Sequence, residues 1–111
     1  MSKYGSKKVI VDGITFDSKR ESNRYCELKL LERGGKIKDL TLQPKFELQP
    51  SFRKNGKTIR AINYVADFTY YDFEKRRNVV EDVKGFKTKE YLLKKKMFEF
   101  KYPDLTIVEI K

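Results

Sequence analysis

The sequence predicts a single α/β domain with the element order αβββαβ, in which a central mixed sheet is flanked by two helices and preceded by an N-terminal β-hairpin. Three observations predict this fold class. Short β-branched and aromatic stretches alternate with two segments of helical pattern. The length of 111 residues holds one domain of ordinary size, and neither a repeat nor a linker divides the chain. We therefore expect residues 1–111 to form one folding unit.

The first elements are a hairpin and a helix. Two apolar stretches within residues 8–16 flank Asp12-Gly13, a dipeptide suited to the positive φ values of a tight turn. A helix should follow as far as about Arg33, with Ser18 as its N-cap and Gly34-Gly35 as its left-handed stop. An apolar stripe at helical spacing should pack on the sheet, and it consists of Tyr25, Leu28 and Leu31.

Two strands come next. Residues 37–52 alternate in polarity and are interrupted by Pro44 and Pro50, which suits a strand at a sheet edge. Asn55-Gly56 is a hairpin signal, and it leads into residues 58–71, the longest β-branched and aromatic stretch. We expect that stretch to be one central strand.

Two further strands and the second helix complete the pattern. Residues 78–84 resume strand character after an exposed turn at Glu74-Lys75. Thr88 should cap a helix that ends near Lys101, and residues 106–110 should form the final strand.

The composition excludes several kinds of chemistry. The chain has no histidine, which removes imidazole bases, Ser-His-Asp nucleophiles and histidine-bound zinc. The single cysteine, Cys26, cannot form an internal disulfide, so a reducing cytoplasmic setting is expected. No apolar run is long enough for a membrane span, and no signal-peptide core follows the first residues. A net charge of +10 indicates a polyanionic partner, of which nucleic acid is the commonest.

Two carboxylates are predicted to face each other. If Glu74-Lys75 is a hairpin tip, Asp67 lies directly across from Asp82 on the neighbouring strand. Like charges so placed are destabilising unless something neutralises them, and a divalent cation would do so. Lys84 is two residues beyond Asp82, so it shares the same face. A one-residue slip of the register would separate the three side chains.

The opposite face of this hairpin is predicted to be apolar, with one exception. Glu81 interrupts it, so we favour Asp82 over Glu81 as the catalytic acid because Asp82 shares a face with Asp67 and Lys84. The residues that should form the apolar face are Ala66, Phe68, Tyr70, Val79 and Val83.

Glu21 has two interpretations. Ser18 and Glu21 match a capping box, in which the glutamate folds back onto the N-cap amide. However, Glu21 also lies on the stripe of Tyr25 and Leu28, where a carboxylate would need a partner such as a metal ion. The sequence leaves both interpretations open.

The residues resemble a known superfamily. Tyr64-Val65-Ala66-Asp67 and the segment from Val79 to Gly85 are similar to the PD-(D/E)XK nuclease signature, although Ala66 stands where proline is usual. The αβββαβ order, residues 16–21 and residues 42–44 extend the similarity over most of the chain. More narrowly, the chain resembles a small phage and prophage family catalogued as a domain of unknown function. The resemblance implies a restriction-endonuclease-like fold and a metal-dependent DNA endonuclease similar to Holliday-junction resolvases.

The resemblance also implies roles for individual residues. Asp67, Asp82 and the Val83 carbonyl would bind Mg²⁺ or Mn²⁺, and Glu21 matches a first-helix acid of the resolvase-like branch. Lys84 would lie beside the attacking water and stabilise the transition state, and Gln43 would line the site. A homodimer in the cytoplasm of a bacterial phage host would supply two active sites for two DNA strands.

Other interpretations remain at this stage. The chain could be a non-catalytic DNA-binding module that keeps the fold, or an assembly protein whose charges stabilise an interface. The carboxylates and Lys84 could equally form an ordinary salt-bridged sheet face. Four lysines near or on the second helix either follow a phosphate backbone or form its solvated face, and they are Lys87, Lys89, Lys94 and Lys95.

Overall fold

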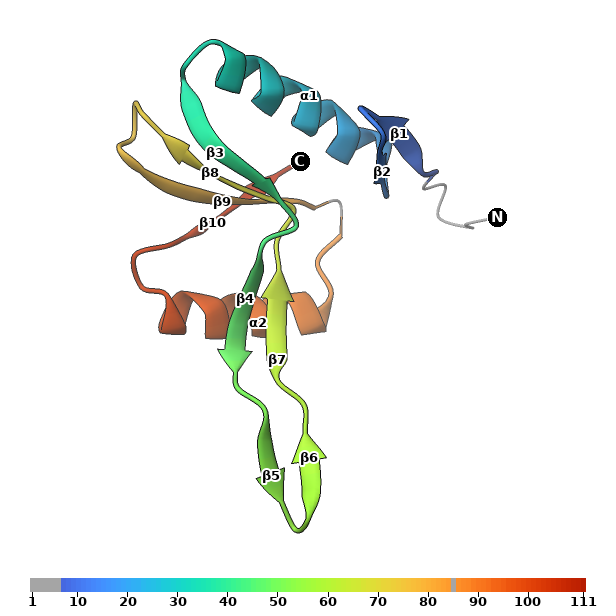
Figure 1. Ribbon diagram of the computed structural model, residues 1–111, viewed down its shortest axis with the longest axis vertical. Helices are drawn as coiled ribbons and strands as arrows, with labels where there is room; N and C mark the ends of the chain where they lie inside the picture. Colours follow the sequence, from blue (N-terminus) through green and yellow to red (C-terminus); the bar gives the residue numbers. More distant parts are fainter. Residues whose placement is uncertain (1–6, 85) are drawn as a thin grey trace.

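A four-stranded mixed sheet forms the centre of the molecule (Figure 1). The computed structural model describes residues 7–84 and 86–111, so Gly85 of the predicted motif lies outside the described residues. The strand order is β10-β9-β8-β3; β9 is antiparallel to β8 and parallel to β10, and β8 is antiparallel to β3. The strands are β3 (Ile37–Leu42), β8 (Phe68–Asp72), β9 (Arg77–Val83) and β10 (Ile107–Ile110).

Two helices cover the sheet and create a hydrophobic core on each face. The α1 helix (Lys19–Arg33) packs on one face, where Leu28 and Phe68 are fully buried. The α2 helix (Lys89–Lys101) packs on the other face, where Val80 and Phe98 are fully buried. Because side chains alternate along a strand, β9 contributes to both cores. The predicted α/β fold with two flanking helices is confirmed.

The N-terminal hairpin and the first helix form as predicted. Strands β1 (Val9–Val11) and β2 (Ile14–Phe16) pair antiparallel around Asp12-Gly13, and both turn residues have positive φ. Gly35 alone supplies the left-handed conformation after α1, with φ +73, and its N–H donates to the Glu32 carbonyl. A cap of this kind satisfies carbonyls that the last helical turn leaves free.

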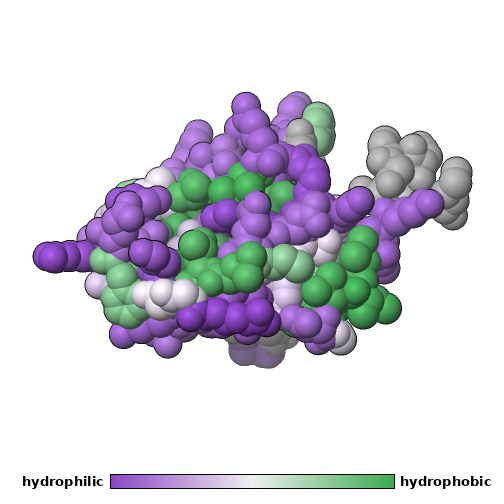
Figure 2. All heavy atoms as spheres, turned by 90° about the horizontal axis from the view of Figure 1, so that it is seen from above, coloured by the Kyte–Doolittle hydropathy of each residue, from purple (hydrophilic) through white to green (hydrophobic). Residues whose placement is uncertain are grey.

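The apolar stripe of α1 is narrower than predicted. Tyr25 and Leu28 are buried, but Leu31 is 38% exposed and Leu30 is 65% exposed. Seen from above, hydrophobic side chains reach the surface in patches between hydrophilic ones (Figure 2). The hairpin shields part of the helix instead, since Tyr25 donates its hydroxyl to Asp12 at 2.9 Å.

The predicted central strand over residues 58–71 is wrong. The segment is divided into β6 (Lys57–Ile59), β7 (Ile62–Val65) and β8, and β7 pairs with β4 (Lys45–Gln49) outside the main sheet. The prediction for residues 37–52 likewise splits, at Pro44, into β3 and β4. Proline has no N–H for the sheet ladder, which explains why β3 cannot continue through it.

The β3–β4 and β7–β8 segments both pass from one sheet to another at the same place. We call this place the strand crossover and define it as residues 43–44 and 66–67. The Gln43 N–H donates to the Asp67 carbonyl at 2.9 Å, and the Ala66 N–H donates to the Pro44 carbonyl at 3.1 Å. Gln43 has a left-handed φ of +49. Backbone hydrogen bonds therefore continue through the crossover, where β3 leads out of the central sheet into β4 and β7 leads into the central sheet as β8.

A second hairpin extends from the β4–β7 pair. Strands β5 (Phe52–Lys54) and β6 are joined by the predicted turn Asn55-Gly56, whose φ values are 52 and 75. This hairpin projects from the body of the molecule (Figure 1). The radius of gyration is 16.0 Å, whereas a compact domain of this length has about 13 Å.

The remaining elements match the predictions closely. Phe68 pairs with Glu81 and Tyr70 with Val79, which is the register that the Glu74-Lys75 tip predicted. Thr88 caps α2 by accepting a hydrogen bond from the Tyr91 N–H at 3.0 Å. Within the described ranges, no helix is both long and apolar enough to cross a membrane.

Candidate active site

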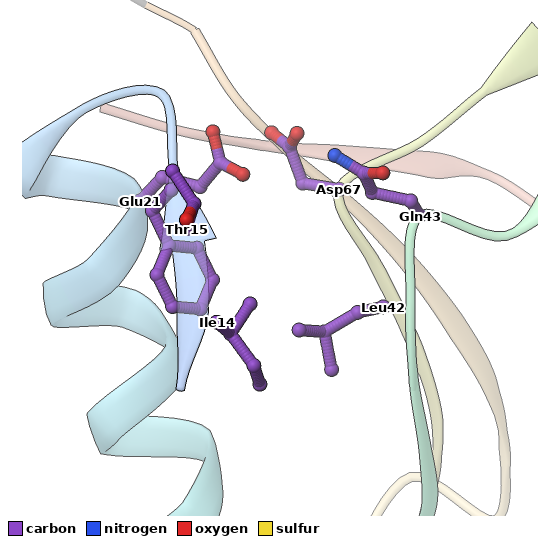
Figure 3. Close-up of a pocket in the computed structure, with 7 residues that line it drawn as sticks. Ile14, Thr15, Glu21, Leu42, Gln43 and Asp67 are labelled. Carbon is purple, nitrogen blue, oxygen red and sulfur yellow. The ribbon is translucent and has the colours of Figure 1, made fainter. Parts of the chain in front are cut away.

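A small pocket opens beside the strand crossover. Its volume is about 100 Å³, and it lies where α1, the first hairpin and the crossover meet. Figure 3 shows the carboxylates of Glu21 and Asp67 pointing toward each other, with the Gln43 amide beside Asp67. Three residues predicted for the site thus come together from three parts of the chain. The pocket is lined by Ile14, Thr15, Phe16, Glu21, Leu42, Gln43 and Asp67.

Asp67 is held firmly at the start of β8. Its N–H donates to the Glu81 carbonyl at 3.1 Å, and its Oδ2 accepts a hydrogen bond from the Val83 N–H at 2.7 Å. These contacts place it opposite the Asp82 region of β9, as predicted. The strand crossover also orients the Asp67 side chain, because the chain passes there from the β4–β7 pair into the central sheet.

The Val83 carbonyl faces the same side as Asp67. The Lys84 N–H donates to the Ile110 carbonyl of β10 at 2.9 Å. In a trans peptide the carbonyl points opposite to the next N–H, so the Val83 oxygen points away from β10 and toward the Asp67 side. A backbone oxygen is therefore available on the side where the resemblance to PD-(D/E)XK nucleases implies one.

Asp82 lies behind Asp67 and is almost fully buried, at 1% exposure. Its Oδ2 accepts a hydrogen bond from the Tyr64 hydroxyl, and its Oδ1 is 3.7 Å from the Lys84 ammonium. Burial raises the pKa of Asp82, and the nearby Asp67 raises it further, while the Tyr64 and Lys84 contacts oppose the rise. The sequence missed Tyr64, although it stands three residues before Asp67.

Lys84 lies between Asp82 and solvent. Its side chain is 26% exposed, and its ammonium lies 4.3 Å from the centre of the Tyr91 ring. Two surface hollows border it, of about 310 and 330 Å³. Because both hollows open to solvent, this ammonium is accessible from outside the molecule while Asp82 stays buried.

Glu21 forms only half of the predicted capping box. The Ser18 hydroxyl accepts a hydrogen bond from the Glu21 N–H at 3.1 Å. Among residues 7–84 and 86–111, the Ser18 N–H donates no hydrogen bond to the Glu21 carboxylate. Burial and the charges of Asp67, Asp17 and Asp82 raise its pKa to about 7. This carboxylate points into the pocket, which favours the cation-binding interpretation.

Glu81 belongs to the opposite face and has different partners. It is 1% exposed and receives two hydrogen bonds from Arg24, at 2.8 and 2.6 Å, and one from the Tyr70 hydroxyl. The predicted separation of Glu81 from Asp82 is confirmed. Burial, followed by the Glu81 hydrogen bond, raises the pKa of Tyr70.

The predicted apolar face requires one correction. Ala66 lies in the core under α2 with Tyr64, whereas Phe68, Tyr70 and Val79 lie in the core under α1. The strand crossover separates Ala66 from Phe68, so the alternation of one continuous strand does not apply across it.

The donor set fits a hard divalent cation. In the described part of the chain, no three Asp, Glu, Cys or His side chains alone form a group that could hold a metal ion. Mg²⁺ commonly uses only one or two carboxylates and completes its shell with other oxygens. Asp67, Asp82, the Val83 carbonyl and Glu21 supply oxygen only. Burial is the main cause of the raised pKa values of Asp82 and Glu21, and the negative charge of the nearby Asp67 raises both further.

We expect divalent cations to stabilise the protein more at pH 8 than at pH 5. The raised pKa of Glu21 means that its protonation stabilises the fold at low pH, and that this stability is lost as the pH rises through about 7. A cation binds the deprotonated form and offsets the loss, with about 4 °C in melting temperature for each kcal/mol of binding. Thermal melts with Mg²⁺, Mn²⁺ or EDTA at both pH values measure it.

The Glu21→Gln variant provides the control for that melt. It should be at least as stable as the wild type at pH 8 in EDTA, because the charge is gone, and should gain less from the cation. Sodium chloride at equal ionic strength accounts for general screening. An equal gain with sodium, or an equal gain in the variant, would contradict cation binding by Glu21.

The four lysines predicted to bind DNA lie in different environments. Lys87 and Lys95 pair with Glu109 at 2.9 and 3.4 Å, and Lys87 is the main reason that the pKa of Glu109 falls to about 2. Lys94 pairs with Glu90 at 3.3 Å, and Lys89 is exposed at the start of α2.

Only some of these lysines border the hollows beside Lys84. Lys87 and Lys94 do, whereas Lys95 is directed to Glu109. The sequence missed two further cations there, Arg20 and Lys111. Arg20 precedes Glu21 in the first turn of α1, and that adjacency was its only signal.

Comparisons with known proteins give one match. The family model described as "Protein of unknown function (DUF1064)" matches residues 1–111. No curated protein and no solved structure matches the chain.

Proposed function

The chain belongs to the family described as protein of unknown function (DUF1064), and we propose that this member is a metal-dependent DNA endonuclease. It would hydrolyse phosphodiester bonds with Mg²⁺ or Mn²⁺, in the manner of the PD-(D/E)XK nucleases that its motif resembles. Asp67, Asp82, the Val83 carbonyl and Glu21 would hold the cation. Lys84 would lie beside the attacking water and stabilise the negative charge that develops on the phosphate.

One observation carries the proposal. Asp67, Asp82 and Lys84 surround the peptide group of Val83: Asp67 accepts its N–H at 2.7 Å, and the Lys84 ammonium lies 3.7 Å from Asp82. A buried aspartate next to a second aspartate is costly for folding alone, so it needs a reason beyond stability. Cation binding and phosphodiester hydrolysis together supply such a reason.

The proposed chemistry divides the work between the chain and its cation. When bound, the cation supplies a Lewis acid for the phosphodiester and lowers the pKa of a bound water. The Lys84 ammonium stabilises the extra negative charge that develops on the phosphate in the transition state. Tyr64 fixes Asp82 through its hydroxyl, and the Val83 N–H fixes Asp67. Two carboxylates are thus oriented before substrate arrives.

The second candidate is a non-catalytic DNA-binding module with the same fold. The basic charge of +10 supports it as well as it supports the nuclease. The pocket argues against it, because Glu21 and Asp67 present negative charge where a binding module would present cations to phosphate.

The proposed substrate is branched or duplex DNA, and the proposed oligomer is a homodimer. Both follow from the resemblance to resolvase-like nucleases, which also supports a phage or prophage setting in a bacterial host. A dimer would bring two active sites to two strands. Gel filtration with light scattering tests the oligomer independently of activity.

A cleavage experiment tests the proposal. The purified chain is incubated with a labelled four-way junction or a linear duplex, with Mg²⁺, Mn²⁺ or EDTA. We expect strand cleavage with either cation and none with EDTA. A variant with both Asp67→Asn and Asp82→Asn controls for contaminating nucleases. If neither DNA is cut but both bind equally well to the wild type and this variant, the binding module replaces the nuclease.

A further inference from the structure

The hairpin of β5 and β6 carries a concentrated positive charge. Between Ser51 and Ala61 it holds four cations and no acidic residue. The cations are Arg53, Lys54, Lys57 and Arg60. We refer to residues 51–61 as the basic arm. The hairpin that carries these charges projects from the body of the molecule (Figure 1).

The basic arm makes few contacts with the rest of the chain in the described structure. All of residues 51–60 are exposed, including Phe52 at 43% and Ile59 at 40%. Its strands pair only with each other in the described structure. A two-stranded hairpin gains little stability by itself in water. The arm therefore contributes little to folding, and its composition calls for another explanation.

The arm is nevertheless built as a stiff element. Asn55 and Gly56 both have positive φ, as in the turn that matches the twist of a two-residue hairpin. The Arg53 guanidinium donates to Thr58 across the strands and to the Gly56 carbonyl, both at 2.9 Å. A preformed ribbon loses less conformational entropy on binding than a flexible loop does.

One face of the arm combines apolar and cationic side chains. Phe52 is paired with Ile59, and Lys54 with Lys57. Because residues two apart share a face, these four side chains lie together. The major groove of duplex DNA accepts a two-stranded β-ribbon, with phosphates along both edges and thymine methyl groups among the base edges on its floor. This face thus matches the chemistry of a DNA groove.

The arm is continuous with the candidate active site. The hollow of about 310 Å³ is bordered by Asn63 and Val65 of β7 and by Lys84 and Lys94. The N-terminal end of β7 is connected through Ala61 to the arm. The turn of the arm lies about 20 Å beyond Gln49, the last residue of β4, at about 3.3 Å per residue. A duplex lying along β7 would meet Lys84 first and the arm farther out.

We propose that the basic arm is a duplex-binding element that lies in a groove of DNA beside the bond to be cut. The inference rests on the proposed nuclease function and adds where the substrate is held. Lys54 and Lys57 contact phosphates of the flanking duplex, and Phe52 and Ile59 contact the groove. The contacts are to shape and charge, so they carry little sequence preference.

Salt-dependent binding tests the proposal without any cleavage. Fluorescence anisotropy in EDTA measures the affinity of the wild type and of Lys54→Ala/Lys57→Ala for a labelled duplex, between about 50 and 200 mM salt. Losing two phosphate contacts should lower the slope of log affinity against log salt by about 1.8, and the affinity by about tenfold or more. The arm variant should melt at the wild-type temperature.

A matched variant separates local contacts from net charge. Lys75→Ala/Arg77→Ala removes the same charge from the other exposed hairpin end, at the β8–β9 turn. It should lower the slope far less than the arm variant does. Equal slopes in the two variants would overturn the proposal, because bulk charge would then explain the loss.

Length dependence gives a second readout. A duplex too short to extend from Lys84 to the arm should bind the wild type and the arm variant equally, and a long duplex should distinguish them. If the wild type binds no DNA at all, the proposed nuclease function itself fails. If it binds and cuts but the arm variant behaves like the wild type, only the arm proposal fails.

Discussion

The Asp82→Asn variant is expected to cleave DNA about 100 to 1,000 times more slowly than the wild-type chain, or more slowly still. Asparagine keeps an acceptor for the Tyr64 hydroxyl, so the fold is retained. It removes the negative charge that would hold a cation beside Asp67. Because burial raises the pKa of Asp82, the neutral side chain should also be tolerated well at pH 8. Rates under single-turnover conditions, with DNA affinity measured in EDTA, separate catalysis from binding.

The neighbouring Glu81→Gln variant is the matched control. It removes an equal charge one residue away, but on the face packed against α1. We expect it to lose stability while its cleavage rate, measured below its melting temperature, stays within a few-fold of wild type. The reverse pattern, with Glu81→Gln inactive and Asp82→Asn active, would show that the acids were assigned to the wrong faces.

Replacing Arg24 is expected to have the largest effect on stability. Its guanidinium donates two hydrogen bonds to Glu81, whose side chain is almost fully buried. Arg24→Met would leave a buried carboxylate without its countercharge, at a cost of about 3–5 kcal/mol in the free energy of unfolding. Urea denaturation followed by circular dichroism measures this change.

The double variant Arg24→Met/Glu81→Gln tests the reason for that loss. A glutamine keeps an acceptor for Tyr70 and carries no charge, so the double variant should be more stable than Arg24→Met alone. If the two variants are equally unstable, lost packing explains the effect instead. The Arg24–Glu81 pair also holds α1 against β9, and Glu21 lies in the same helix three residues before Arg24.

Local signals were sufficient to predict most of the fold. Asp12-Gly13 and Asn55-Gly56 form the expected turns, and Ser18 and Thr88 form the expected caps, because each acts through its immediate neighbours. The strand crossover was not predicted. The crossover depends on a backbone hydrogen bond between Gln43 and Asp67, which are far apart in the sequence. Residues 58–71 contain so many β-branched and aromatic residues that their pattern predicts one continuous strand.

The candidate site was predictable to the extent that strand register determines it. The tip at Glu74-Lys75 fixes the pairing of β8 with β9, which brings Asp67 to Asp82. The partners of these acids were not predictable, since Tyr64 and Arg24 reach them from other elements. Glu21 lies between these cases: its helix position was evident, but only tertiary packing decides what its carboxylate faces.

The parallel pairing of β10 with β9 determines when this site can assemble during synthesis. Glu109 lies beside Asp82 and Ile110 beside Val83, so β10, the C-terminal strand of the described structure, completes the sheet next to the acids. Domains form from the N-terminus onward as they are translated, and a parallel pair across α2 forms late. A nascent chain in which β10 has not yet been translated therefore has an open sheet edge at β9, and the sheet beside the acids is complete only after β10 has been made.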